Sequence, residues 1–300
     1  MNSEDKSEDK SEMNSAIITH RWEGIDHFSS LSVIGGYYMV LGGGRLGADF
    51  ARYAKANSLP FVVILDIDRN SEASHSSTII DRSGLLRLIK EYSASNISPD
   101  RVYFHCMDIS EISVLLEAGI PEYIVPAVPS HAVADIAIDM LGSISSRPLI
   151  SRFNIDEKDD DFAAYFHAVL SSLPREVVTH SSVQEGMIML SYALPGEICP
   201  ANCACPENYC YNFKRKKHET ITTYVRKLLS EYNGWVFESY QMKEGIGGIR
   251  GQDLKKYMLS LMDHVWQVTE QNDNDRAYSR YFFIATTCNC HGIVNILYVL

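Results

Sequence analysis

The sequence predicts an α/β fold in which a Rossmann-type parallel sheet with helices on both faces precedes a cysteine-rich α+β region. Three observations lead to this prediction. Strands and helices alternate from about residue 37 to 141, a glycine-rich turn joins the first strand to the first helix, and six of the seven cysteines form two groups in the second half. Alternating strands and helices are typical of a parallel sheet that is covered on both faces.

Short apolar runs at residues 37–41 and 61–65 predict two buried strands, and the amphipathic stretch that begins at Leu46 predicts the helix between them. Two further runs, 101–106 and 123–128, predict the third and fourth strands. The intervening stretches predict helices over residues 83–93, 110–117 and 131–141. Each strand–helix–strand step forms one parallel βαβ unit.

We divide the chain into three parts. Residues 1–30 are expected to be a disordered acidic tail, because their polar SEDK repeats cannot bury a core. Residues 31–150 are expected to form a dinucleotide-binding domain, and residues 151–300 a cysteine-rich, metal-binding region packed against it. In this last part the run 281–285 predicts a buried strand, and residues 219–231 and 252–265 predict helices.

Composition excludes several classes of function. The 300 residues carry 27 Lys and Arg against 38 Asp and Glu, a net charge of −11, which opposes binding to nucleic acid. No long apolar run predicts insertion into a membrane, and the start of the sequence has no apolar signal segment. A cytoplasmic protein is therefore expected, and clustered cysteines in that compartment favour metal or redox chemistry over structural disulfides.

The glycine-rich turn has the pattern of a phosphate-binding loop. Its residues are Gly42, Gly43, Gly44, Arg45, Leu46 and Gly47. In such a loop the first glycine permits the tight turn, the second lets a pyrophosphate approach the backbone, and the last lets the helix pack on the strand. The amides and dipole at the start of the helix stabilise the anion.

Asp66 ends the second strand, where a carboxylate accepts hydrogen bonds from ribose hydroxyls and repels a 2′-phosphate. The sequence therefore predicts NAD(H) as the ligand, in preference to NADP(H). Asp68 is a second acid that could cap the following loop. A site for S-adenosylmethionine also uses a glycine turn and a strand-end acid, although the spacing to Gly47 favours a dinucleotide.

Residues 37–128 resemble the nucleotide-binding (TrkA-N) domain of the TrkA/RCK type found in potassium-uptake regulators. The resemblance rests on the glycine loop, on Asp66 and Asp68, and on Asp108 followed by the segment 115–120, LLEAGI. It implies a nucleotide site that includes Asp108, but no particular reaction. The whole chain also resembles prokaryotic proteins that join such a domain to a cysteine-rich half.

The two cysteine groups contain thiols at a spacing suited to convergence. The first group is Cys199, Cys203, Cys205 and Cys210, and the second is Cys288 and Cys290 with His291. Thiolates bind zinc and iron–sulfur clusters, which usually take four protein ligands. Irregular spacing favours an iron–sulfur cluster, with zinc as the alternative and redox-active or structural thiols as a third interpretation.

We expect the two groups to form one site. Cys199, Cys203 and Cys210 are the preferred ligands, completed by Cys288 or Cys290, with Cys205 as another source of the fourth thiolate. The strand predicted at 281–285 would bring the second group to one edge of the region. Cys106, which stands alone, is interpreted as a small core residue.

Three other features allow two interpretations each. His131 follows the fourth strand and is either an acid/base beside the nicotinamide or a helix-start residue, the second being favoured. The glycines between residues 245 and 251 form either an anion-binding nest or a flexible turn. The basic run 214–217 either holds an anionic substrate or redox partner or is a solvated loop, and the loop is the default.

The sequence thus predicts an NAD(H)-binding, oxidoreductase-like protein with a thiolate-bound metal centre. The alternative is a non-catalytic nucleotide sensor of the TrkA/RCK kind with a structural zinc. No complete catalytic constellation is visible in the sequence, so no residue is assigned to catalysis. Expected partners are a nucleotide and a redox partner protein, with a homodimer as one option.

Overall fold

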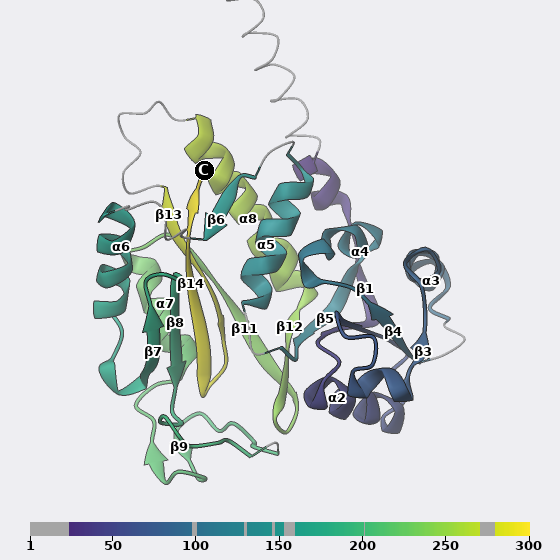
Figure 1. Cartoon of the computed structure of the whole chain (residues 1–300), viewed down its shortest axis with the longest axis horizontal. Coiled ribbons are helices and arrows are strands. Elements are labelled where there is room, and N and C mark those ends of the chain that lie inside the picture. The colour runs from purple at the N-terminus through teal and green to yellow at the C-terminus, as the bar shows by residue number, and fades with distance from the viewer. Residues whose placement is uncertain are drawn as a thin grey trace, which may run out of the picture.

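The computed structural model describes residues 24–97, 101–128, 131–145, 148–152, 160–200, 202–270 and 280–300. Most of the expected tail lies outside these ranges. Residues 24–30, which we had placed in the tail, form a helix whose Ile25 and Phe28 are buried in the main core. Figure 1 shows one large sheet that runs across the molecule with helices packed along it.

The first half is an alternating α/β structure, as the sequence predicts. Its strands are mutually parallel and lie in the order β4-β2-β1-β5, with the short β3 outside β4. The strand bounds are β1 (Val33–Leu41), β2 (Phe61–Asp66), β3 (Thr78–Ile79), β4 (Val102–Cys106) and β5 (Ile120–Pro126). The helices between them are α2 (Arg45–Ala56), α3 (Arg82–Ser95), α4 (Ser113–Ala118) and α5 (Ala132–Ser143).

Helices cover both faces of these strands because the strand residues are apolar on both sides. On one face α2 packs on alternate residues such as Val40, Val62 and Ile64. On the other face α3, α4 and α5 pack on intervening residues such as Met39 and Val63. Burial on both faces explains why these strands read as continuous apolar runs.

The helix expected at residues 110–117 begins later than predicted. Residues Ile109–Glu111 form a short 3-10 turn, η2, and α4 starts at Ser113. The side chain of Asp108 accepts a hydrogen bond from the Ser110 amide at 2.9 Å, so the cap belongs to the turn. A second 3-10 turn, η1 (Glu72–Ser76), follows β2.

The second half continues the same sheet. β12 (Ile246–Arg250) pairs antiparallel with β5, so the sheet crosses the boundary that we placed at residue 150. The order beyond β12 is β11-β13-β14-β8-β7, and β6 also pairs with β14. Their bounds are β6 (Ile150–Arg152), β7 (Val178–Ser182), β8 (Met187–Ser191), β11 (Gly234–Lys243), β13 (Tyr281–Thr287) and β14 (His291–Val299).

Helices of the second half cover opposite faces of its strands. α8 (Gly251–Glu270) joins the core formed by α3, α4 and α5. α6 (Asp160–Ser171) and α7 (Ile221–Lys227), with the turns η3 (Arg175–Val177) and η4 (Leu228–Ser230), enclose a separate core against β8, β13 and β14. In the described ranges, no helix combines the length and apolar character needed to cross a membrane.

A small two-stranded ladder, β9 (Tyr209–Cys210) with β10 (Arg215–Lys216), lies outside the main sheet. Figure 1 shows the segment around β9 at the same end of the sheet as α2. The first cysteine group therefore lies at the end of the sheet where the glycine loop is located.

Candidate functional site

The second cysteine group occupies the tight turn between β13 and β14. β13 ends at Thr287 and β14 begins at His291, which places Cys288 and Cys290 in the turn itself. The turn is closed by a hydrogen bond of 2.8 Å from the Cys288 amide to the His291 carbonyl oxygen. Because both strands lie in the interior of the sheet, the thiols of the turn are held at a defined place where these two strands end.

The first cysteine group lies in the long connection between β8 and β9, which other turns hold in place. The Cys203 carbonyl oxygen accepts hydrogen bonds from the Gly245 amide at 3.0 Å and from the Gln241 side chain at 3.3 Å. The Asn289 side chain donates to the Cys205 carbonyl oxygen at 2.9 Å. The connection is therefore fixed to both the β11–β12 and the β13–β14 turns.

The structure brings the two cysteine groups together. Cys205 Sγ lies 3.1 Å from Cys290 Sγ and 3.8 Å from Cys288 Sγ. His291 adds a second link, because its Nε2 is 3.4 Å from Cys199 Sγ and its Nδ1 is 3.9 Å from Cys288 Sγ. The two groups therefore lie together, and we call Cys199, Cys203, Cys205, Cys288, Cys290 and His291 the cysteine cluster.

Two cysteines take other positions. Cys210, one of our preferred ligands, is buried in β9, where it pairs with Arg215 of β10. In the described part of the chain no sulfur contact joins it to the cysteine cluster. Cys106 is half-buried at the end of β4, where its thiol donates to the Ile67 carbonyl oxygen at 3.4 Å. Cys210 interacts with Cys199 only through a longer-range electrostatic effect, and Cys106 stands apart from both groups.

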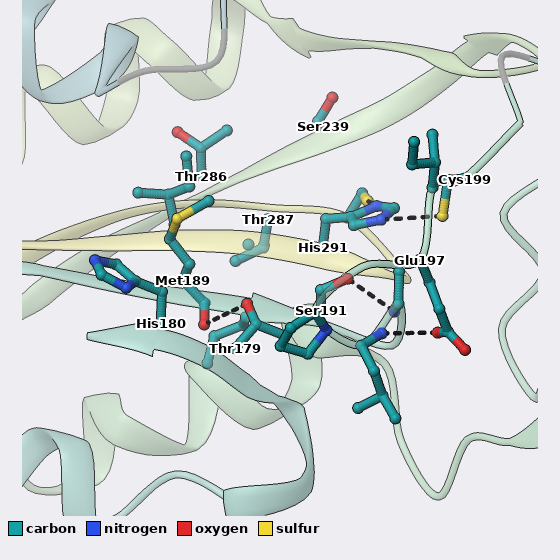
Figure 2. A pocket seen from close by; sticks show the side chains of 18 of the residues that line it. Thr179, His180, Met189, Ser191, Glu197, Cys199, Ser239, Thr286, Thr287 and His291 are labelled. Atoms are coloured by element: carbon teal, nitrogen blue, oxygen red, sulfur yellow. Dashed lines mark hydrogen bonds between the residues drawn. The ribbon is translucent and has the colours of Figure 1, made fainter.

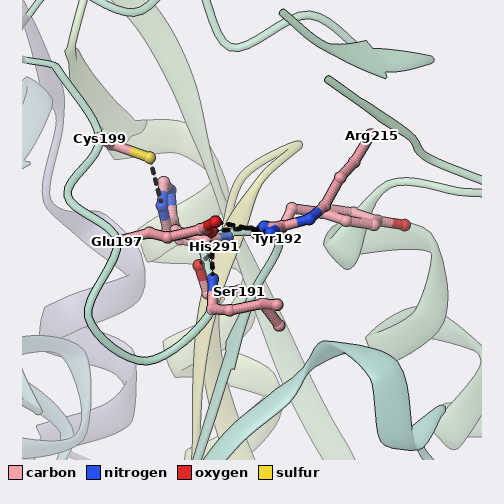
Figure 3. A network of polar contacts seen from close by, with 8 residues as sticks. Ser191, Tyr192, Glu197, Cys199, Arg215 and His291 are labelled. Carbon is pink, nitrogen blue, oxygen red and sulfur yellow. Dashed lines mark hydrogen bonds and ion pairs between the residues drawn. The ribbon is translucent and has the colours of Figure 1, made fainter. Parts of the chain in front are cut away.

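The basic run 214–217 contacts the cysteine cluster through Lys217. The sequence did not predict this contact. Lys217 is 2% exposed, and its Nζ donates to Cys290 Sγ at 2.7 Å and to the carbonyl oxygen of Pro206. Arg215 forms a two-point ion pair with Glu197 and donates to the Tyr192 carbonyl oxygen at 2.9 Å. Figure 3 shows the contacts of Arg215 with Glu197 and Tyr192 beside Cys199 and His291.

Hydrogen bonds divide the thiols of the cluster into donors and acceptors. The thiol contacts of Cys205 with Cys288 and Cys290 raise the pKa of Cys205, and the contact with Cys205 lowers the pKa of Cys288. The hydrogen bond from Cys205, followed by the nearby Lys217 ammonium, lowers the pKa of Cys290 to about 6. Burial raises the pKa of Cys199 to about 11. The cluster therefore favours thiolate at Cys288 and Cys290 and thiol at Cys199 and Cys205.

The donor atoms of the cluster are of the kinds that bind a soft metal, but their spacing in this structure differs from that of ligands around a bound metal. Two thiolates on a tetrahedral zinc lie about 3.8 Å apart. The Cys205–Cys288 separation of 3.8 Å meets this value, whereas the Cys205–Cys290 separation of 3.1 Å is too short. Among the described residues, no group of three or more Cys, His, Asp or Glu side chains is placed to hold a metal ion.

Two cavities meet at the cysteine cluster. The cluster cavity, about 540 Å³, is lined by Arg45 and Leu46 of α2 on one side and by Cys203, Cys205 and Cys288 on the other. The second cavity, about 640 Å³, lies near the end of β5 and is lined mainly by the segments 189–199 and 286–293. Cys199, Ser239, Cys288 and His291 line both cavities and so form the wall between them. Figure 2 shows Cys199 and His291 side by side at this wall.

The glycine loop has the close approaches expected from its sequence. Gly42 has a φ of +108°, which disfavours any other residue, and an ideal Cβ on Gly47 would lie 2.0 Å from the Gly42 carbonyl oxygen. A Cβ on Gly44 would have nothing within 4 Å, so open space faces this residue at the start of α2. Of the three glycines in the pattern, Gly44 is therefore the one that faces open space.

The three acids predicted for the nucleotide site all hydrogen-bond to backbone amides. Asp66 accepts from the Gly43 amide at 2.5 Å and from the Asp68 amide at 2.8 Å, which fixes the glycine loop to the end of β2. Asp68 accepts from the Asn70 amide at 2.9 Å and Asp108 caps η2. None of these three side chains lines either cavity described above, and their contacts with a nucleotide stay a prediction.

The remaining sequence candidates, His131 and the glycines between residues 245 and 251, make contacts that belong to the fold itself. His131 precedes α5, and its Nδ1 contacts the Oδ1 of the buried Asn295 in β14. Gly245 supplies the turn between β11 and β12 with a φ of +78°. Gly251 begins α8 so close to β5 that an ideal Cβ would overlap the Pro121 carbonyl oxygen. These glycines therefore serve packing and turn formation in the described fold.

A family model described as "Uncharacterized protein, C-terminal domain" (AF_1314_C) matches residues 143–300, the half that supplies the cysteine cluster. The chain belongs to this family. It is also similar to a protein of Archaeoglobus fulgidus described as "Uncharacterized protein", with 26% identity over 259 residues that cover 86% of this chain and 98% of that protein. This similarity extends beyond the residues of the family match. No solved structure matches the chain.

Proposed function

We propose that this AF_1314_C family member is an NAD(H)-binding oxidoreductase whose cysteine cluster exchanges electrons with the nucleotide or with a partner protein. The observation that carries the proposal is the cluster cavity. Its walls combine the start of α2, at Arg45 and Leu46, with the thiols of Cys205 and Cys288. A bound dinucleotide carries hydride, and thiols undergo two-electron oxidation, so the two would meet across one cavity.

Three features support a dinucleotide at the glycine loop. The parallel strand order β4-β2-β1-β5 supports a Rossmann-type sheet, in which ligands would bind beyond the carboxyl ends of β1 and β5. The open space in front of Gly44 would leave room for a pyrophosphate, which the amides of α2 would stabilise. The buried hydroxyl of Ser71 has no hydrogen-bond partner among the described residues, and it lies directly beneath Gly43. Asp66 favours NAD(H) over NADP(H).

The second cavity is suited to an uncharged substrate. Apolar side chains such as Val128, Met189 and Ile293 line much of it, together with hydroxyl groups. Its carboxylate, Glu197, is already neutralised by Arg215. A small, mostly apolar molecule bound there would contact Cys199 and His291, which also face the cluster cavity. Substrate and nucleotide would thus approach the same wall from opposite sides.

The binding half of the proposal is tested with Gly44→Val. We expect this substitution to reduce NADH affinity by at least about tenfold, because the side chain fills the space required by the pyrophosphate. Gly35→Val is the matched control, since Gly35 also has nothing within 4 Å of an added Cβ and lies in β1, outside the loop. Calorimetry that gives equal NADH affinity for both variants would refute the site. Asp66→Asn should weaken NADH binding more than NADPH binding.

The redox half is tested by turnover. We expect the purified protein to oxidise NADH in the presence of an artificial electron acceptor and to lose this activity in Cys205→Ser. Metal analysis and a visible spectrum after anaerobic purification test the metal centre, an iron–sulfur cluster by preference and zinc as the alternative. A protein that binds NADH but oxidises none, with several acceptors, would exclude the oxidoreductase.

A second candidate function is a nucleotide sensor of the TrkA/RCK type with a structural zinc. The observation that favours it is that the β8–β9 connection is bonded at Cys203 to Gly245 of the β11–β12 turn and at Cys205 to Asn289 of the β13–β14 turn, so that three segments are joined as by a structural cross-link. For a sensor we expect NADH or ATP to change the hydrodynamic size of the protein without turnover. Analytical ultracentrifugation with and without nucleotide distinguishes the two functions.

A further inference from the structure

Two thiols that are 85 residues apart in the sequence are in direct contact. Cys205 Sγ donates to Cys290 Sγ at 3.1 Å, and this is the shortest of the sulfur–sulfur contacts in the described part of the chain. Each residue is held by its own backbone. The Asn289 side chain donates to the Cys205 carbonyl oxygen at 2.9 Å, and the Cys290 carbonyl oxygen accepts from the Tyr192 amide at 3.1 Å.

We propose that Cys205 and Cys290 form a reversible disulfide, a modification site whose oxidant is a hydroperoxide. A disulfide bond is about 2.05 Å long, so the two sulfur atoms need to approach by about 1 Å. Rotation of the Cys205 side chain can supply this movement because Cys205 lines the open cluster cavity, whereas Cys290 is buried in the β13–β14 turn.

The chemistry balances in two steps. Cys290 accepts hydrogen bonds from Cys205 and from Lys217 Nζ, so its sulfur carries the electron pair that attacks the peroxide. The O–O bond breaks, Cys290 becomes a sulfenic acid, and the leaving oxygen departs as water or as an alcohol. Cys205 then attacks the Cys290 sulfur, forming the S–S bond and releasing a second water. Two thiols are oxidised by two electrons and one peroxide is reduced by two electrons.

Cys288 is the competing partner for Cys205, and its longer distance from the Cys205 sulfur disfavours it. Its sulfur is 3.8 Å from Cys205 and faces His291 Nδ1 at 3.9 Å, on the side of the turn that lines both cavities. Cys290 faces the buried Lys217 instead. Cys290 itself does not line the cluster cavity, but the cavity reaches Cys205, whose sulfur is 3.1 Å from that of Cys290, and so brings a small peroxide to the contact between the two thiols.

The disulfide would also determine whether the cluster can bind metal. A sulfur that is engaged in a disulfide has no thiolate to offer, so oxidation and metal loading would compete for Cys205 and Cys290. The inference does not require a nucleotide, and it can be tested on protein without one. Failure of NADH binding would therefore leave it unaffected.

The experiment treats the metal-free full chain with about one equivalent of hydrogen peroxide and maps the peptides by mass spectrometry. We expect a mass loss of about 2 Da, a peptide pair joined through Cys205 and Cys290, and full reversal by a dithiol reductant. Cys106→Ser is the control and should form the same cross-link, because Cys106 lies at the end of β4 and contacts Ile67.

Two variants make the proposal falsifiable even if one folds poorly. Cys205→Ser should leave a sulfenic acid at Cys290, about 16 Da heavier and reactive with a sulfenic-acid probe. Cys288→Ser should keep the Cys205–Cys290 cross-link. A cross-link between Cys205 and Cys288 in the unsubstituted chain, or sulfinic acid formation without any cross-link, would overturn the proposal.

Discussion

The close contact between α2 and the first strand gives a quantitative test of the glycine loop. An ideal Cβ on Gly47 would lie 2.0 Å from the Gly42 carbonyl oxygen, so Gly47→Ala requires α2 to move away from β1. Such overpacking costs about 2–3 kcal/mol, and the higher helix propensity of alanine offsets about 1 kcal/mol. We expect a net loss of about 1–2 kcal/mol in the free energy of unfolding, which lowers the Tm by about 2–6 °C.

The matched control for this prediction is Gly142→Ala. Gly142 is also helical, in α5, but an added Cβ there has nothing within 4 Å. This substitution should raise the free energy of unfolding by about 1 kcal/mol. Thermal and urea unfolding followed by circular dichroism would measure both variants. If the two alanine substitutions shift stability in the same direction by similar amounts, the contact between α2 and Gly42 is not as the structure describes it.

Three further predictions concern the second half of the chain. The thiolate absorbance of Cys290 should appear near pH 6, and Lys217→Met should move this titration to higher pH. The pKa of Cys290 in the folded protein lies below the ordinary value of 9.0. The contribution of this thiolate to stability is therefore fully present above about pH 9 and is lost as the pH falls through about 6. Arg215→Gln should remove the ion pair with Glu197 and increase the rate of proteolysis in the connection between β8 and β9, with an unchanged cleavage pattern contradicting this role. Asn295→Ala should lower the free energy of unfolding by about 1–3 kcal/mol, since it leaves the His131 ring without its buried partner; an unchanged urea midpoint would contradict the contact.

The first half of the fold could be predicted because each of its strands and helices is indicated by a short stretch of consecutive residues. The apolar runs that became β1, β2 and β4 are buried on both faces and carry their signal in consecutive residues. The cysteine cluster could be predicted for another reason. Two sulfur-rich segments in one chain are explained together by a single site, and Cys205 does contact Cys288 and Cys290.

The second half could not be derived because its strands pair over long sequence separations. β12 lies beside β5, and β11 lies parallel to β13, pairings that no local pattern specifies.

The buried Lys217 was missed for a different reason. In the basic run, residues 214 and 216 are exposed while Arg215 is half-buried and Lys217 is buried, so the run alternates like an extended strand. Charge alone indicated a solvated loop, and the period of two was the signal that could have found the buried lysine.

The pairing of β12 with β5 has a consequence for how the chain is synthesised and cut. When β5 has left the ribosome, the strand that will cover its free edge is still more than a hundred residues away in the sequence. Until then β5 presents unpaired amides and carbonyls, which readily accept a strand from another molecule. A fragment ending near residue 150 would keep that edge open permanently and would also lack α8, so it should aggregate. Expression trials should therefore use the whole chain, with the glycine loop and the cysteine cluster on one polypeptide.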